Sequence, residues 1–478
     1  MTSAMRGALA LKRLLRRLPL AGLAIVAPFV IVSAGFVTHH EALLRYLLPA
    51  FLPICALILY HRNRQAYLSF ILAVWFFIPL LRRLVDYRAG WVDPNPMLLA
   101  AYSTSLIVPL IRLPAFLKTN LQRSFPFLLC LVGIAFGSVS GIFAYHLTSV
   151  VHDFANWLTP IAFAAFLVLE QENNEDYLVA LERWLPLWLV LTAAYTILQF
   201  VLAFPWDMAW LTNLDAPSMG VPEPFGFRAF GNLNSAGTAA FVFSTGALYV
   251  LNLKRWWRLP VFGLITVALL TTQVRAGWLA LAIGFFISLV KLPRRTVQPL
   301  LVLIVLGVGA SIVGLEGDAA VITERVHSFT EAKNDDSANG RLQGLQVAWN
   351  DLETHPFGHG LGVPEDIFNI SGSFSLLDSF PVHLFVTFGW LGGAAYLAGL
   401  LSMLLPVLGG ILHSRSRRYL LTAIPAVALC SIFLLGSVTV ALSGMLVWMF
   451  LPLSLYTLAE ESAADPFFHL RMLELDEA

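Results

Sequence analysis

The stretch "LKRLLRRLPLAGLAIVAPFVIVSAGFV" at residues 11–37 sets a basic segment directly in front of a long apolar run. Signal peptides begin in the same way, and the small residues Val32–Ser33–Ala34 leave cleavage as an alternative. Comparable apolar runs, each about 17–25 residues and long enough to cross a bilayer, recur along the whole chain. We therefore interpret residues 20–37 as an uncleaved first membrane span.

Composition supports the same fold class. The chain of 478 residues is 58% hydrophobic and only 12% charged, whereas a soluble protein carries about 25% charged residues. We predict an all-α polytopic integral membrane protein with about 12–14 transmembrane helices. The expected spans lie near residues 20–37, 42–60, 66–81, 97–112, 126–148, 154–169, 184–204, 233–252, 259–273, 276–291, 297–315, 383–411, 419–437 and 438–457.

Short loops rich in Lys and Arg set the predicted orientation. With the N-terminus inside, the cytoplasmic loops hold the basic groups of residues 61–64, 112–123, 254–258, 291–295 and 413–418, as the positive-inside rule requires. Two long segments then fall outside, at residues 205–227 and 316–382. The second holds eleven acids and three bases, and a loop of such length is commonly functional.

The external loop contains a predicted short amphipathic helix. Asn339 is a plausible N-cap, and Leu342, Leu345, Ala348, Trp349 and Leu352 follow at helical spacing. Pro356 and the glycines at 358, 360 and 362 end the helix. Arg341 would lie in its first turn, where backbone N–H groups also favour an anion.

Two histidines after this helix raise the question of a metal. The i, i+4 spacing of His355 and His359 is that of zinc ligands. Pro356, Gly358 and Gly360 interrupt any helix between them, and no third ligand follows at a usual spacing. We therefore expect a turn with exposed imidazoles and no metal. Cys55, Cys130 and Cys430 lie in apolar segments and are expected to be small buried hydrophobes.

Four polar residues converge on the predicted external face, where a charge in the membrane is costly and needs a reason. Arg228 and Arg275 border spans, Arg341 opens the loop helix, and His383 begins the span after the loop. Each also has a simpler explanation. Arg275 could extend its side chain to the lipid headgroups, and Arg228 could bind carbonyl groups of the neighbouring loop. Arg341 could pair with the acids of the external loop, and His383 could be an ordinary histidine at the membrane interface. Their common placement favours a shared anion site.

These segments, in this order, resemble the O-antigen ligase and O-antigen polymerase family of bacterial membrane glycan transferases. The resemblance rests on four motifs and covers residues 225–400. The motifs are Arg228–Ala229–Phe230–Gly231–Asn232–Leu233–Asn234; Gln273–Val274–Arg275–Ala276–Gly277–Trp278; Arg341 and Trp349 with His355–Pro356–Phe357–Gly358–His359–Gly360–Leu361–Gly362; and His383 with Gly389–Trp390–Leu391–Gly392–Gly393. Leu384 departs from the Asn that often follows the family histidine.

The resemblance implies a GT-C-like helical fold and a glycosyl transfer at the outer face of the inner membrane. The donor would be a polyprenyl-diphosphate-linked glycan and the acceptor a second glycan or a lipid core. Arg228, Arg275 and Arg341 would clamp the diphosphate, because the arginine fork matches phosphate oxygens. His383 would act as base. Arg82, Arg83 and Arg88 would attract the lipid carrier, or contact headgroups near Asp86.

The resemblance further implies no cofactor and no metal. Membrane lipids and a chain-length regulator protein are the expected partners. Nothing in the net charge of +1 indicates nucleic acid. We expect N-terminal spans over residues 1–224, a catalytic region over 225–411 that includes loop 316–382, and C-terminal spans with a cytoplasmic tail over 412–478. A polymerase is favoured because the predicted spans outnumber those of the ligases; an O-antigen ligase and a flippase for lipid-linked oligosaccharide remain alternatives.

Overall fold

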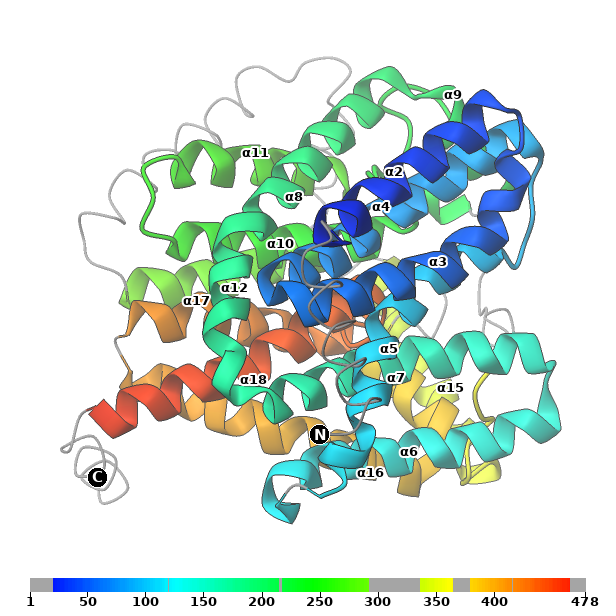
Figure 1. The fold of residues 1–478 in the computed structure, drawn as a ribbon. Coiled ribbons are helices and arrows are strands. Elements are labelled where there is room, and N and C mark those ends of the chain that lie inside the picture. The colour runs from blue at the N-terminus through cyan, green and yellow to red at the C-terminus, as the bar shows by residue number, and fades with distance from the viewer. Residues whose placement is uncertain are drawn as a thin grey trace, which may run out of the picture.

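The computed structural model of the protein describes residues 20–118, 120–214, 217–291, 336–363, 379–414 and 416–464 (Figure 1). This part of the chain is helical, and its only extended pairing is an isolated bridge between Gly220 and Phe227. In chain order the helices are α2 (Leu20–Val37), α3 (Glu41–Arg62), α4 (Arg64–Ala89), α5 (Leu99–Phe116), α6 (Leu121–Ala144), α7 (Leu147–Leu169), α8 (Asn174–Leu202), α9 (Pro205–Leu214), α10 (Ala236–Asn252), α11 (Arg258–Thr271), α12 (Arg275–Lys291), α15 (Asp336–Thr354), α16 (Phe380–His413), α17 (Arg417–Cys430) and α18 (Ala441–Ala464).

Nine helices of the described part are long and apolar enough to cross a membrane, and α10 and α11 are shorter apolar helices. The predicted all-α polytopic membrane fold is thus confirmed. Every expected span corresponds to a helix except 297–315, which lies outside the described residues, as does about half of loop 316–382. The tail from residue 465 also lies outside them.

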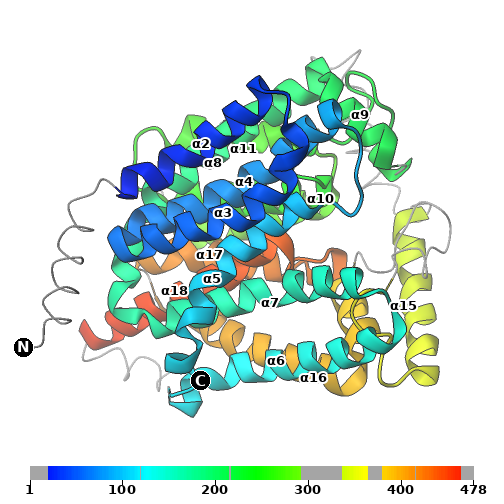
Figure 2. The same cartoon turned by 45° about the vertical axis from the view of Figure 1, so that its right-hand side comes forward.

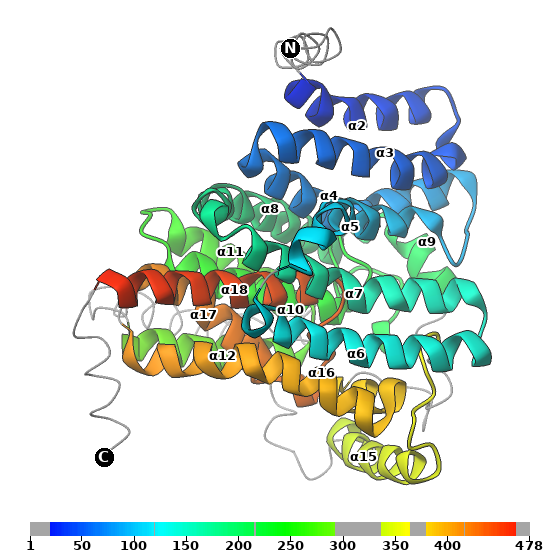
Figure 3. The same ribbon diagram turned by 60° about the horizontal axis from the view of Figure 1, so that its bottom comes forward.

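Burial increases from one flank of the bundle to its centre. The α2 span has 6% of its residues buried inside the protein, whereas the α18 span has 78%. All residues of α10 except Gly237 and Thr238 are buried, as expected for a helix that is apolar on every side. Figure 3 shows α2 and α3 stacked on one flank and α16 with α15 on the opposite flank.

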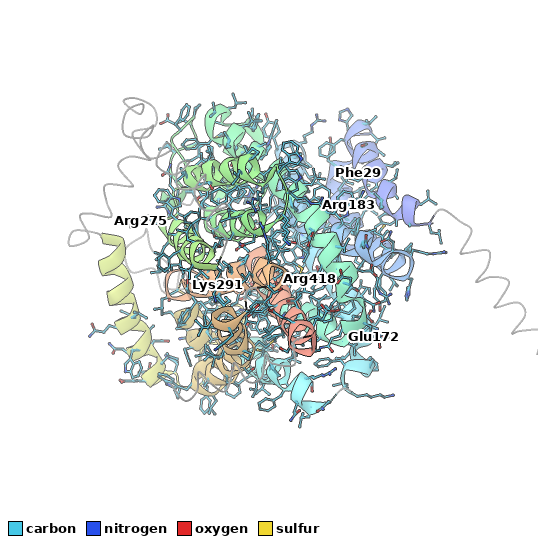
Figure 4. The ribbon with its side chains drawn as sticks, turned by 90° about the vertical axis from the view of Figure 1, so that its left-hand side faces the viewer. Phe29, Glu172, Arg183, Arg275, Lys291 and Arg418 are labelled. Atoms are coloured by element: carbon cyan, nitrogen blue, oxygen red, sulfur yellow. The ribbon has the colours of Figure 1, made fainter. Side chains whose placement is uncertain are left out.

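Charged side chains join the helix ends at one end of the bundle, which we call the basic end. Glu170, at the end of α7, accepts from Arg112 at 2.8 Å and lies 3.4 Å from Arg64. Lys291 donates to the carbonyl of Leu412, so α12 and α16 finish together. Figure 4 views this end and labels Lys291, Arg183 and Arg418 around it. The basic loops predicted to share one side of the membrane therefore do meet at one end.

The opposite end, which we call the site end, carries α9 and α15 (Figures 1 and 2). Two helix breaks shape it. Within α16, Gly389 has a left-handed backbone with φ 65°. The expected span 419–437 ends earlier, because α17 stops at Cys430 and residues 431–440 hold only a short 3-10 helix, Phe433–Leu435, before α18. Gly436 fits this break against α10, since a Cβ there would lie 2.2 Å from Phe241.

Candidate functional site

The segment that carries Arg228 is held by polar side chains buried inside the bundle. Gln199 of α8 accepts hydrogen bonds from the backbone N–H groups of Phe230 and Gly231, at 3.1 and 2.8 Å. Gly231 has φ 58°, and a Cβ there would lie 2.1 Å from the Thr196 hydroxyl, which explains the glycine. The backbone around Arg228 is therefore fixed in place, since its donors and acceptors are satisfied by side chains of neighbouring helices.

Arg83 of α4 completes this support. Its Nε donates to Asp207 of α9 at 2.7 Å, and both side chains are 0% exposed. The remaining guanidinium donors reach the carbonyl oxygens of Gly231 and Leu233 and, at 3.2 Å, Asn234. A buried arginine needs such complete pairing, because the membrane interior offers no water to satisfy it. Arg83 thus ties α4, α9 and the Arg228 segment together.

The turn that carries Arg275 adjoins the Arg228 segment. The N–H of Ala229 donates to the carbonyl of Thr271 at 3.1 Å, and Gln273 donates to the carbonyl of Phe227 at 3.5 Å. Arg228 and Arg275 are both half-buried, and Arg275 is the first residue of α12. In the end-on view, Arg275 is drawn on the flank where α15 stands (Figure 4). The two arginines expected to act together therefore lie on neighbouring segments.

His383 lies in the first turn of α16, between α7 and the break before α18. Its ring meets Trp157 of α7 edge-on, with 5.0 Å between centroids. Its Nδ1 lies 3.4 Å from the Ser437 hydroxyl. Asp153, one turn before Trp157, is within electrostatic range of the same imidazole. The histidine is thus held by an aromatic ring and a hydroxyl, with a carboxylate close by.

The glycine-rich loop after α15 enters the break in α16. The N–H groups of His359 and Gly360 donate to the carbonyls of Val386 and Thr387, at 2.8 and 2.9 Å. These carbonyls are available because the helix is interrupted at Gly389. The loop also reaches α6 and α7: the N–H of Leu361 donates to the carbonyl of Gly137, and that of Gly362 donates to Asp153 at 2.8 Å.

Close backbone approach explains the glycines of this motif. A Cβ at Gly358 would lie 2.4 Å from the nitrogen of Gly389, and one at Gly360 would lie 2.3 Å from that of Gly141. Gly358 and Gly360 also have φ of 70° and 90°. Because only glycine fits both the contact and the conformation, the loop is fixed beside the turn that carries His383.

The helix α15 differs from its prediction at one end. It already includes Asp336, so Asn339 lies inside the helix and is not its N-cap. Arg341 lies in α15, but the structure does not describe its side chain. The helix ends at Thr354, two residues before Pro356, as predicted.

Ala348 and Leu352 of α15 are buried against the bundle. Trp349 is 56% exposed and touches Trp390 edge-on, so it holds the helix less than the sequence suggests. Burial raises the pKa of the Tyr145 phenol, which also contacts this helix, and the nearby Asp351 carboxylate raises it further.

The prediction of two exposed imidazoles in the turn was half wrong. The side chain of His355 is 53% exposed, but that of His359 is only 16% exposed. Both rings face Asp351, which comes from the last turn of α15.

The three arginines expected at the lipid carrier have different surroundings. Arg82 is buried and pairs with Asp86 at 3.1 Å and with Asp93 at 3.2 Å. Arg83 is buried as described. Arg88 is 53% exposed and lies 3.4 Å from Glu41. Arg88 also borders a hollow of about 600 Å³ between α2, α4 and α9, lined mainly by apolar side chains.

Sequence reasoning missed three acids that organise this end: Asp153, Asp207 and Asp351. The available signal was a single acid in an apolar setting, as in "VVHDFANW" and "PWDMAW". A charge there is costly unless it has a partner or a role. The partners themselves are distant in sequence and could not be named from it.

Comparison with known proteins agrees with this architecture. Residues 260–397 match the model of the family described as O-antigen ligase. The match is shorter than a third of the chain and includes Arg275, Arg341 and His383, while Arg228 precedes it. No curated protein matches the chain. Residues 260–397 are thus similar to the O-antigen ligase family, and the multi-pass helical fold and the motifs of residues 225–400 agree with that similarity.

Proposed function

We propose that the protein transfers a glycan from a polyprenyl diphosphate carrier to an acceptor hydroxyl at the external face of the bacterial inner membrane. The observation that carries this proposal is the position of His383 within the matched region. It lies one turn from the carbonyls that hold the glycine-rich loop, and within electrostatic range of Asp153. The site end corresponds to the face predicted to be external from the basic loops.

In the proposed reaction the acceptor oxygen attacks the anomeric carbon while the bond from that carbon to the diphosphate oxygen breaks. His383 takes the acceptor proton, and the lipid diphosphate leaves with its electron pair. Since Nδ1 is directed to Ser437, we assign the base role to Nε2. Asp153 stabilises the imidazolium that results, as an acid beside a catalytic histidine does.

Arg228 and Arg275 are proposed to hold the diphosphate, together with Arg341. Negative charge grows on the leaving oxygen in the transition state, and fixed cations in a poorly solvated site stabilise it. Arginine suits this task because its planar fork binds two phosphate oxygens at once. Supporting this role, Arg228 and Arg275 lie on segments joined by backbone and side-chain hydrogen bonds.

Of the arginines predicted to meet the lipid carrier, we retain Arg88. Arg82 and Arg83 have buried guanidinium groups that are paired within the protein. The exposed guanidinium of Arg88 suits the anionic diphosphate of the lipid carrier, and the apolar hollow beside it suits the hydrocarbon chain.

The finer proposal is a surface-polysaccharide polymerase, with an O-antigen ligase as the alternative. The polymerase is preferred because the spans predicted from the sequence outnumber those of the ligases. A deletion strain separates the two: single repeats remaining on the lipid core indicate a polymerase, and polymer left on the carrier indicates a ligase.

The test of the reaction itself uses purified protein and a defined lipid-diphosphate glycan. His383→Ala should abolish transfer while leaving the protein folded and monodisperse. His413→Ala is the matched control, because His413 lies at the other end of the same helix and its ring bonds the carbonyl of Gly409 in that helix at 2.8 Å. Near-normal transfer by His383→Ala would refute the assignment.

A further inference from the structure

Three side chains at the end of α15 and in the loop that follows it form a compact cluster, and all three are of residue types that bind metal ions. Asp351 is in the last turn of α15, His355 follows that helix, and His359 is in the glycine-rich loop. His355 Nδ1 lies 3.1 Å from an Asp351 oxygen, and His359 Nε2 lies 3.0 and 2.9 Å from the two oxygens of the same carboxylate. One ligand atom from each residue lies within 4.8 Å of the others, the only such group of three in the described residues.

The backbone holds this cluster firmly. The N–H of His355 donates to the carbonyl of Asp351 at 2.7 Å, which continues the helical hydrogen bonding past the end of α15. The N–H of His359 is bound by the carbonyl of Val386 in α16. Between them Gly358 takes φ 70°, which turns the chain back so that both rings face the same acid. The helix break seen in the sequence therefore brings the histidines together, where it was expected to separate them.

The separations suit a tetrahedral transition metal. Zinc binds histidine nitrogen and carboxylate oxygen at about 2.0–2.2 Å, so neighbouring ligand atoms in a tetrahedral site lie roughly 3.3–3.5 Å apart. The contacts of the Asp351 carboxylate with the two rings, 2.9 to 3.1 Å, need to open by only a few tenths of an ångström, and the ligand atoms of all three residues lie within 4.8 Å of one another. Asp351 and His359 are each 16% exposed, so two of the three ligands already have lost most of their water.

We propose that Asp351, His355 and His359 bind one Zn²⁺ ion. Three protein ligands leave a fourth position for water. Since Asp351 belongs to α15 and His359 is bonded to α16, the ion would fasten the loop helix to the membrane bundle. This site is separate from the proposed transfer chemistry, in which the ion takes no part, and it stands or falls independently of that reaction.

The test measures metal binding by the full-length, untagged protein in detergent. After treatment with chelator and dialysis, titration with Zn²⁺ should show one equivalent bound per chain, and Mg²⁺, which prefers oxygen ligands, should show none. Asp351→Asn and His359→Gln should each weaken zinc binding at least about tenfold. His355→Gln, at the most exposed of the three, provides a variant with little risk to folding.

A second histidine pair supplies the control. His39 and His40 are adjacent and lie near Glu41 at the same end of the bundle. The double variant His39→Gln/His40→Gln should keep the full zinc equivalent. Wild-type protein that binds no zinc would show the cluster to be a hydrogen-bonded one only and would overturn the proposal. Zinc binding that is unchanged in all three ligand variants would do the same.

Discussion

The buried pair of Arg83 and Asp207 offers a prediction whose size follows from its surroundings. Asp207→Leu removes the carboxylate and leaves a guanidinium that is 0% exposed without its counter-ion. Removing one partner of such a pair costs about 3–5 kcal/mol. Asp207→Asn leaves one oxygen where Arg83 and Tyr195 each donate to a separate carboxylate oxygen at 2.7 Å, so one donor loses its acceptor and the cost should stay in the same range.

Equilibrium unfolding in mixed micelles with increasing SDS, followed by tryptophan fluorescence, measures this cost. A loss of 3–5 kcal/mol raises the unfolded-to-folded ratio by roughly 10²- to 5,000-fold. The control is Arg88→Gln, which removes an arginine that is 53% exposed and paired with Glu41. Its loss should stay below about 1 kcal/mol, the usual value of an exposed ion pair.

A double variant separates stability from positioning. Arg83→Met with Asp207→Leu removes both charges, and apolar replacement of a buried pair is often neutral. Part of the stability should return, but the Leu233 carbonyl loses the Arg83 donor and the Gly231 carbonyl keeps only that of Gln199 at 3.3 Å. Glycan transfer should therefore stay low, because the Arg228 segment loses its tie to α4. Asp207 variants as stable as Arg88→Gln, or a double variant with full transfer, would refute the reasoning.

Three further substitutions test the site end. Gly141→Ala should lower both thermal stability and glycan transfer, because its Cβ would lie 2.2 Å from the carbonyl oxygen of Leu361. Gly409→Ala is the control and should change neither, because nothing lies within 4 Å of its Cβ. Arg275→Lys keeps the charge but loses the forked donor, so the KM for the lipid-diphosphate donor should rise with little change for the acceptor; equal effects on both substrates would contradict a diphosphate contact. Asp153→Asn keeps an acceptor for the loop but removes the charge near His383, and transfer should fall about 10²-fold or more with thermal stability preserved.

Much of the membrane architecture could be predicted from sequence, because hydrophobic length depends only on local composition. The α2 helix ends at the residue expected, and α15 ends just before Pro356 as predicted. The extent of α17 could not be predicted, because residues 431–437 are apolar enough to continue a span, and the close packing of Gly436 against Phe241 of α10 is not visible in the sequence.

The candidate site was predictable residue by residue but not as an arrangement. His383 and Arg275 could be selected because polar groups at span ends are few in so apolar a chain. Their supports come from remote segments: Asp153 binds a loop more than two hundred residues later, and Arg83 binds α9 and the Arg228 segment. Sequence spacing reports neighbours along a helix, and it says nothing of contacts at such separation.

The glycine-rich loop is bonded to the interrupted part of α16, and this limits which segments can be exchanged with a related protein to make a working chimera. A chimera that exchanged only residues 316–382, the predicted external loop, would carry the glycine-rich loop away from the interrupted helix that accepts it. The incoming loop would meet a foreign Gly389 region, and the N–H groups of His359 and Gly360 would have to find their acceptors there. The smallest unit that can be exchanged therefore extends through Gly389 of α16, and it needs the small residues Gly137 and Gly141 of α6 in the recipient.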